Sequence, residues 1–537
     1  GPYALFTQYD PRDFGLRLVD ADGEGQTPIG AVDYTVGHEH DYSITSVSLA
    51  YRKKVDEKRL AEWLTGLFQE KNNSIYRTKG IVDVAGKDTR TVIHGVHSLL
   101  NFTEDRPWNK DEARASQLVF IGRDLDKKSL KKHLNFLEEA KKRDHRKLGK
   151  ELELFHFESV APGSPFFMPK GAFVYNELVE FMRRIYRKYD YKEVITPQVL
   201  GSELWHTSGH YQNYKDDMFF TNIEKGEFAV KPMNCPFHIL VYKNDIRSYK
   251  ELPIRYFELG SVYRMEKTGV LHGLLRARGF TQDDAHIFTT IDNLNDEILN
   301  LLTFSIKLLN CFGFNDIEAD LSTRPNDSIG KDIDWQNATN SLEEALNQQN
   351  ISYKIAQGEG AFYGPKIDLH IKDAIGRRWQ LTTIQIDFAQ PNNFSLEYVN
   401  SDNKKVRPVM IHRALLGSIE RFTGILIEHY AGEFPGWLAP TQINILTIGN
   451  VNEYLDKIIK KFSKYRINID NRNVRLGEKI HDSKKMKIPI TLIIGENDSK
   501  NNTVAINYLS GEETKDISLE YGLKSINKAL NKPKFKL

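Results

Sequence analysis

The segment from Lys231 to Phe288 constrains the fold most, because it places charged residues inside stretches that alternate like β-strands. It contains the sequences KPMNCPFH, RYFELGSVYRMEKTG and LHGLLRARGFTQDDAHIF. An arginine in a strand is costly to desolvate unless an anion meets it, and a planar guanidinium can bind a phosphate through two hydrogen bonds. The segment therefore predicts a site for a phosphorylated ligand. The arginines and acids that lie close together in it are Arg264, Glu266, Arg276, Arg278, Asp283 and Asp284, with His286 beside them.

Three residues form a candidate zinc-ligand set: Cys235, His286 and His412, the last in PVMIHRALLGSIER. One thiolate and two imidazoles suit zinc, and three protein ligands leave a fourth position open, as a catalytic zinc requires. The spacing alone is weak evidence, because the three residues lie far apart in the sequence. A cysteine that acts as a small buried hydrophobic residue, together with a satisfied core histidine, is the alternative interpretation.

Sequence motifs throughout the region support the interpretation as zinc ligands. VITPQV with Pro197 is similar to motif 1, Arg264 and Glu266 with RARGFTQDDAHIF to motif 2, and GSIERF with Arg421 to motif 3 of class II aminoacyl-tRNA synthetases. Within that class, the chain from about Asn135 to its end resembles the threonyl-tRNA synthetase family. The resemblance implies ATP-dependent ligation of threonine to tRNA(Thr) through a threonyl-adenylate.

The same resemblance implies a role for each residue of the site. Arg264 and Arg421 would be catalytic, and Cys235, His286 and His412 would bind zinc. ATP, with magnesium, would contact Glu266, Arg276, Phe280, Gln380 and Lys366, and threonine would contact Met233, Gln282, Asp284, Tyr363 and Gln385. A homodimer is also implied, because the helix and strand around motif 1 build the dimer contact in this class.

We expect an α+β multidomain protein with a class II antiparallel sheet and flanking helices in residues 156–438. Leu178, Phe181, Met182 and Ile185 recur at helical spacing, so one side of that helix should be buried. The segment Tyr191–Val199 predicts a strand. NLNDEILNLLTFSIKLLNCFG predicts a long helix, and the region around Lys366 and Gln380 predicts paired strands.

The two ends of this region differ in pattern. Residues 129–155 predict a charged linker helix with a narrow stripe of Leu130, Leu134 and Leu137, which is solvated or contacts tRNA. From residue 439 to 537, strands alternate with helices, which predicts a mostly parallel α/β domain that resembles the anticodon-binding domain of this class. Asn507 occupies a position where the family usually has an arginine, which puts a tRNA contact there in doubt.

Residues 1–128 predict a separate small α+β domain. The segments HEHDYSITSVSL, RTKGIVDVAG, HGVHSLL and SQLVFIGRDLD resemble the C-terminal domain of CobW-type metallochaperone GTPases, but no G-x-x-x-x-G-K-[ST] loop is present. The pairs His38/His40 and His94/His97 are interpreted as surface histidines, with metal binding as the alternative. We recognise no ubiquitin-like or editing domain here, and the domain is either a natural fusion or an assembled one.

Composition sets the remaining limits. Lys and Arg number 74 against 72 Asp and Glu, so RNA contacts must come from local patches. Two cysteines exclude a disulfide framework, and no apolar run is long enough to span a bilayer, so we expect a cytoplasmic protein without membrane contact. Two alternatives stay open: a synthetase paralogue that acts on a different acceptor or only binds RNA, and a zinc-handling fusion protein.

Overall fold

The computed structural model describes residues 18–19, 25–26, 44–51, 54–55, 57–70, 74–97, 99–109, 112, 114–123, 125 and 139–531. The packing divides the chain into two compact units, Gly1–Asn135 and Phe136–Leu537. In the described part of the chain, no helix is long and apolar enough to cross a membrane.

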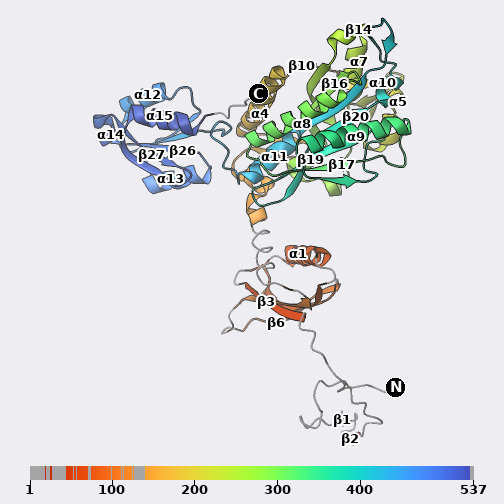
Figure 1. The fold of residues 1–537 in the computed structure, drawn as a ribbon. Helices are drawn as coiled ribbons and strands as arrows, with labels where there is room; N and C mark the ends of the chain where they lie inside the picture. The colour runs from red at the N-terminus through yellow and green to blue at the C-terminus, as the bar shows by residue number, and fades with distance from the viewer. Residues whose placement is uncertain are drawn as a thin grey trace. The chain divides into compact units, whose positions relative to one another are not determined.

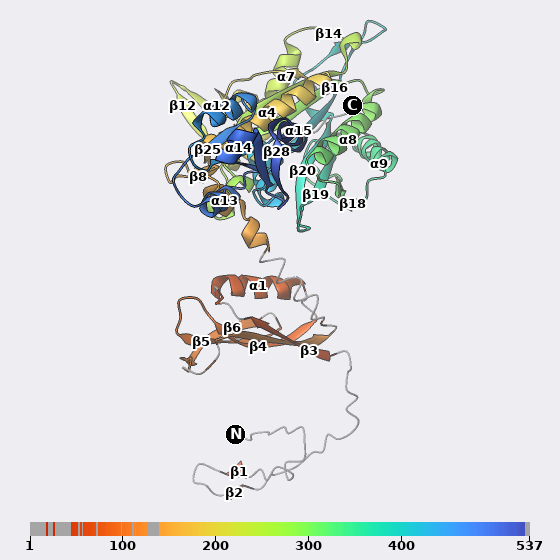
Figure 2. The same cartoon turned by 90° about the vertical axis from the view of Figure 1, so that its left-hand side faces the viewer.

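The first unit contains a five-stranded antiparallel sheet with one helix against it (Figure 2). The helix α1 spans Glu57–Glu70, and Leu60, Leu64, Leu67 and Phe68 are buried on its apolar side. These elements confirm the predicted small α+β domain. In spatial order, the strands are β3 (Ile44–Tyr51), β7 (Ser116–Arg123), β4 (Ile75–Asp83), β5 (Thr89–Val96) and β6 (Leu99–Pro107).

The second unit is built around an eight-stranded sheet that is antiparallel except at its two edges (Figure 1). This confirms the predicted class II type of sheet. Its central strands β16 and β23 carry long buried runs, as expected for strands covered on both faces. The spatial order is β10 (Lys192–Glu193), β15 (Ile254–Tyr263), β16 (Gly279–Thr289), β23 (Val409–Ser418), β20 (Arg378–Asp387), β19 (Lys366–Lys372), β17 (Ile317–Ser322) and β18 (Tyr353–Ala356).

Helices pack against this sheet through one apolar core. The predicted helices are confirmed as α4 (Pro169–Lys188) and α8 (Leu294–Cys311), and α4 begins with a proline, which suits the first helical position. The helix α11 (Ile419–His429) continues directly from β23 and begins where the Ser418 side chain accepts a hydrogen bond from the Arg421 backbone N–H. The helix α9 (Asp332–Gln348) lies beside α8 (Figure 1).

The predicted strand Tyr191–Val199 is wrong as a single element. Only Lys192–Glu193 pairs with β15, and Val199 begins a separate strand, β11 (Val199–Gly201), in another sheet. Between them, the backbone N–H of Thr196 donates to the Glu258 carboxylate at 3.0 Å instead of to a neighbouring strand. The exposed Pro197 follows and has no N–H to offer a strand, so the chain leaves the sheet here.

The predicted linker helix is also not one continuous helix. Residues 139–143 are helical, Asp144 interrupts the helix, and its side chain caps a new helix, α3 (His145–Glu151). This part of the chain is not a solvated linker, because His145 and Leu148 are buried. Leu130, Leu134 and Leu137 lie outside the described residues.

The C-terminal sheet has three parallel strands followed by two antiparallel ones, so the mostly parallel prediction holds for its first part. The strand β25 and the helix α13 (Leu476–Lys485) were not predicted. Asn507 lies on β27, only 8% exposed, with Thr491 and Glu513 as its cross-strand neighbours. The strand order is β25 (Ile467–Asp470), β24 (Ile443–Thr447), β26 (Ile490–Ile494), β27 (Thr503–Tyr508) and β28 (Glu513–Ser518).

Candidate active site

A cavity of about 790 Å³ lies over the strands β15, β16, β20 and β23 and the start of α11. All but one of the predicted site residues line this cavity. They come from distant parts of the sequence, since Met233 and Arg421 are 188 positions apart. These residues are Met233, Cys235, Arg264, Glu266, Arg276, Phe280, Gln282, Asp284, His286, Tyr363, Gln380, Gln385, His412 and Arg421.

The exception is Lys366, which is not among the residues that line the cavity. Its ammonium lies 2.8 Å from the Asp368 carboxylate on the same strand. In the sheet, Lys366 is the cross-strand neighbour of Gln385, which does line the cavity. The lysine is therefore one strand away from the site and already paired.

The three candidate metal ligands come together at one end of the cavity. Cys235 is the first residue of α7 (Cys235–Lys243), and His286 and His412 face each other across β16 and β23. Their ligand atoms all lie within 4.8 Å of one another, and all three residues are buried. A sulfur and two imidazole nitrogens in this arrangement fit a tetrahedral zinc ion with one open position.

In each candidate histidine, one ring nitrogen makes a hydrogen bond to a neighbouring side chain and the second is left for a metal. His412 contacts the buried Asp387 through Nε2 at 2.8 Å. His286 contacts His238 through Nδ1 at 2.8 Å, and His238 in turn contacts Glu258 at 3.3 Å. These bonds leave His412 Nδ1 and His286 Nε2 for a metal, and partners of this kind fix the ring orientation of metal-bound histidines.

The electrostatics of this end also fit a cation. Burial, followed by the nearby Asp284 and Asp387 charges, raises the pKa of Cys235 well above its usual value. Burial and the neighbouring His238 lower the pKa of His286 well below its usual value. A neutral imidazole is the form that binds a metal, and a zinc ion would stabilise the thiolate that burial alone disfavours.

Another part of the cavity lining is cationic and aromatic. Arg264 lies 5.3 Å from the centre of the Phe280 ring, and its Nε donates to the Pro232 carbonyl at 3.2 Å. Glu266 and Arg276 form an ion pair at 2.9 Å. This pairing was not predicted, because the resemblance implies that both residues contact ATP.

Arg421 is anchored at the start of α11. Its NH1 donates to the Leu275 carbonyl at 3.0 Å, and its Nε and NH2 both donate to the Gln380 carbonyl at 3.3 Å. Burial, and then the charge of Arg276, lower its pKa. A cation that burial and a like charge both disfavour is a suitable binding group for an anion.

Other residues of this site were not singled out from the sequence. His210 lines the cavity, its Nδ1 lies 2.7 Å from the Ser208 hydroxyl, and burial lowers its pKa to about 4. Arg413, which also lines the cavity, donates to the hydroxyl of the buried Tyr186 at 2.8 Å, and Tyr186 donates to Asp283 at 2.9 Å. Only the arginine directly after His412 in a buried strand could have indicated this network.

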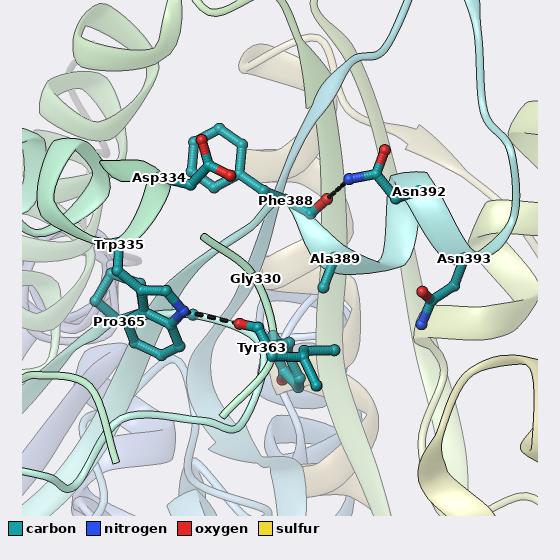
Figure 3. A pocket seen from close by; sticks show the side chains of 11 residues that line it. Gly330, Asp334, Trp335, Tyr363, Pro365, Phe388, Ala389, Asn392 and Asn393 are labelled. Carbon is teal, nitrogen blue, oxygen red and sulfur yellow. Dashed lines mark hydrogen bonds between the residues drawn. The ribbon is translucent and has the colours of Figure 1, made fainter. Parts of the chain in front are cut away.

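A second, smaller cavity of about 150 Å³ lies next to the main one, and Tyr363 borders both. Figure 3 shows Trp335 and Asn392 at its walls, where the indole N–H donates to the Ile329 carbonyl and the Asn392 amide donates to the Phe388 carbonyl. The Tyr363 hydroxyl itself donates to Gln385 at 2.8 Å. The two cavities therefore share Tyr363 as a lining residue.

The histidine pairs of the first unit lie elsewhere. His94, on β5, and His97, in the turn that follows, are both exposed, which fits the interpretation as surface histidines. His38 and His40 lie outside the described residues.

Comparisons with known proteins assign the parts of the chain. Residues 219–430 match the tRNA synthetase class II core domain (G, H, P, S and T), and residues 442–528 match an anticodon binding domain. Residues 44–137 match the cobalamin synthesis protein cobW C-terminal domain. The predicted resemblances are therefore confirmed for all three parts.

Individual relatives agree with this assignment. A threonine–tRNA ligase of Clostridium kluyveri is 48% identical over 429 residues, which cover 79% of this chain and 67% of the relative. A threonine–tRNA ligase of Thermotoga petrophila is 47% identical over 76% of this chain and 65% of the relative. The RNA binding domain of threonyl-tRNA synthetase from Cryptosporidium parvum Iowa II has a TM-score of 0.69 and 38% identity, covering 73% of this chain and 99% of that structure.

The chain thus spans about two thirds of the length of these curated relatives. Within that length, the matched domains are those of a class II synthetase core and an anticodon binding domain, as the names of the relatives imply. The chain belongs to the threonine–tRNA ligases, class II synthetases that join threonine to tRNA.

Proposed function

We propose that the main cavity activates threonine with ATP and passes it to tRNA(Thr), with threonine at the metal end and the nucleotide at the arginine end. The observation that carries this proposal is that Cys235, His286 and His412 lie in the same cavity as Arg264 and Arg421. A metal site beside cationic side chains suits a reaction that joins an amino acid to a phosphorylated nucleotide.

At the metal end, Cys235, His286 and His412 would hold zinc. When bound, zinc would supply a Lewis acid for the amine and the side-chain hydroxyl of threonine. The buried Asp284, which accepts a hydrogen bond from Asn234 at 3.2 Å, offers a carboxylate for the amine. The pair of Tyr363 and Gln385, together with Met233 and Gln282, would enclose the rest of the amino acid.

In the first step, the threonine carboxylate would attack the α-phosphate of ATP and displace pyrophosphate, so two anions meet. Arg264 and Arg421 would stabilise the charge that develops, and their anchoring to backbone carbonyls orients both groups before the reaction. The Phe280 ring is available for stacking by adenine. Positioning and charge stabilisation carry most of phosphoryl-transfer catalysis, so no general base is needed.

The ion pair between Glu266 and Arg276 would open when ATP binds. Glu266 would then meet the exocyclic amine of adenine, and Arg276 would hold the outer phosphates with magnesium. Because Arg276 is about half exposed, the cost of exchanging its partner is small. In the second step, a terminal ribose hydroxyl of tRNA would attack the carbonyl carbon of the mixed anhydride, which forms the ester and releases AMP.

A homodimer is part of this proposal. Ile195 is 89% exposed in the segment that joins β10 to β11, where the family has its motif 1 dimer contact. A large apolar side chain so exposed beside Pro197 fits a surface that another subunit covers. Both cysteines are free, which fits a reducing, cytoplasmic environment.

The test is the replacement Cys235→Ser. We expect the purified wild type to hold one zinc per chain and to catalyse threonine-dependent pyrophosphate exchange and tRNA(Thr) charging. The variant should lose both zinc and exchange activity while keeping its melting temperature. Cys311→Ser is the matched control, because Cys311 is a half-buried residue of α8 outside the cavity lining. Full exchange activity in a zinc-free wild-type protein would contradict the proposal.

A further inference from the structure

A buried cluster outside the cavity links α3 to the loop that carries Arg276. His145, at the start of α3, is fully buried, and its Nδ1 lies 2.6 Å from a carboxylate oxygen of Glu428 on α11. Its other nitrogen, Nε2, lies 3.1 Å from the backbone N–H of Leu274. A residue from the beginning of the second unit is therefore bonded to two segments of the catalytic core.

The hydrogen bonds define the protonation of this ring. A backbone N–H can only donate, so Nε2 of His145 accepts and carries no proton. The proton is therefore on Nδ1, which donates to Glu428. Arg377 fixes the second oxygen of the same carboxylate at 2.6 Å. His145 is thus a neutral imidazole that connects a held carboxylate to one backbone amide.

A metal does not explain the cluster, although Asp144, His145 and Glu428 place possible ligand atoms close together. Both nitrogens of His145 already have partners. Arg146 pairs with Asp144 at 2.7 Å, and Arg377 pairs with Glu428, so an arginine neutralises each carboxylate. The function of the cluster must therefore be sought in the loop that it contacts.

The contacted loop is the short 3₁₀ turn η5 (Gly273–Leu275), which ends immediately before Arg276. The Leu275 carbonyl accepts the hydrogen bond from Arg421 at 3.0 Å. Leu274, Leu275 and Arg276 all line the main cavity. The bond from His145 therefore holds the turn that directs one arginine of the ATP end and anchors another.

Close packing at Gly273 shows that this contact leaves little free space. Gly273 has a positive φ of 52°, and a Cβ at this position would lie 2.2 Å from His145 Nε2. The same Cβ would lie 2.9 Å from the side chain of Arg146. On the other side, a Cβ at Gly424 of α11 would approach Leu275 to 3.1 Å. The turn is thus held between α3 and α11.

We propose that His145 is a positioning residue for the ATP end of the active site, acting on Arg276 and Arg421 through the turn Gly273–Leu275. The inference rests on the proposed roles of these two arginines. The metal end does not depend on this turn, because its ligands are carried by α7, β16 and β23. Loss of His145 should therefore weaken the use of ATP and leave the binding of threonine unchanged.

The test is His145→Phe, which keeps the ring volume and removes both ring hydrogen bonds. In pyrophosphate exchange, we expect the KM for ATP to rise about five- to tenfold, the scale of one lost hydrogen bond, while the KM for threonine stays within twofold. His145→Gln should recover most of the loss, because its amide oxygen can accept from Leu274. The control is His156→Phe, since His156 is an exposed histidine.

Gly273→Ala tests the same contact from the other side and decides the question if His145→Phe does not fold. It should raise the KM for ATP in the same selective way. The double variant should lose no more than the worse single variant, because both changes break one contact. An unchanged KM for ATP in a folded variant, equal rises for ATP and threonine, or no recovery with His145→Gln would each overturn the inference.

Arg276→Ala and Arg421→Ala, measured alongside, separate this inference from the proposed function. If these two variants use ATP like the wild type, the proposed ATP site is wrong. If they use ATP poorly and His145→Phe does not, only the role of His145 is wrong.

Discussion

Replacing Asp387 by Asn tests the proposed role of His412 as a zinc ligand. Asp387 is fully buried and uses both carboxylate oxygens. One oxygen accepts from the backbone N–H groups of Ala389 and Gln390 at 2.7 and 2.9 Å, and the other contacts His412 Nε2 at 2.8 Å. An asparagine that keeps its oxygen toward the two backbone groups must turn its NH₂ group toward His412.

The magnitude follows from this geometry. The NH₂ group can only donate, so His412 must move its proton from Nε2 to Nδ1, which is the nitrogen left for the metal. Binding zinc then requires either the less favourable ring form or a lost buried hydrogen bond. Loss of such a partner typically lowers metal affinity about 10- to 100-fold, which corresponds to about 1.4 to 2.7 kcal/mol.

The assay is competition for zinc between the protein and a chelator at fixed free zinc, together with the KM for threonine. Asp368→Asn is the matched control, because Asp368 is also buried, on the neighbouring strand β19, and bonds Thr383 rather than a candidate ligand. We expect the control to keep its zinc affinity. An Asp387→Asn protein that folds and binds zinc like the wild type would refute the assignment of His412 Nδ1 as a ligand.

Three further predictions concern the rest of the chain. Arg264→Ala and Arg421→Ala should each lower adenylate formation in the exchange assay about 100-fold or more, which is the scale of losing a preorganised donor. Arg472→Ala should not lower it, because Arg472 lies between two aspartates of the C-terminal domain, and equal losses in all three variants would contradict the assignment. In the same assay, activation should favour threonine over valine by about 10⁴- to 10⁵-fold, because valine lacks the hydroxyl, and over serine by only about 10- to 200-fold, because serine lacks one methyl group. Equal discrimination against both amino acids would argue against ligation through the hydroxyl. Because burial raises the pKa of Glu420 to about 7, the free energy of unfolding should fall by up to about 3 kcal/mol as the pH rises from about 4.5 to 7. Denaturant titrations of the Glu420→Gln variant should not show this fall.

Much of the fold was predictable because its elements obey local rules. The helix α4 shows its buried side in the spacing of Leu178, Met182 and Ile185, and the class II sheet follows from the family resemblance. The segment Tyr191–Val199 shows where such rules fail. It has the composition of a strand, but the Glu258 carboxylate takes the N–H of Thr196. A side chain 62 positions away thus decided the local structure.

The same distinction holds for the site. Fourteen of the residues that line the cavity could be predicted, because the resemblance to the family identifies them one by one. Their partners could not, because Asp387 meets His412 across two strands and His145 meets Leu274 over 129 positions. The ion pairs could not be predicted either, since Lys366 pairs with Asp368 on its own strand and does not line the cavity. Partners of this kind depend on register and packing, which no short motif encodes.

The two ends of the cavity are therefore supported differently. At the metal end, His286, His412 and Gln385 lie in one cross-strand row of the sheet, so the hydrogen bonds of three strands fix their spacing. At the ATP end, Arg276 follows a three-residue turn whose position depends on α3 and α11. A rigid sheet suits the recognition of a small amino acid, for which one methyl group must count. The proposed exchange of Glu266 for phosphate at Arg276 suits a loop held by a few contacts, and the effects of substitutions should divide accordingly between the two substrates.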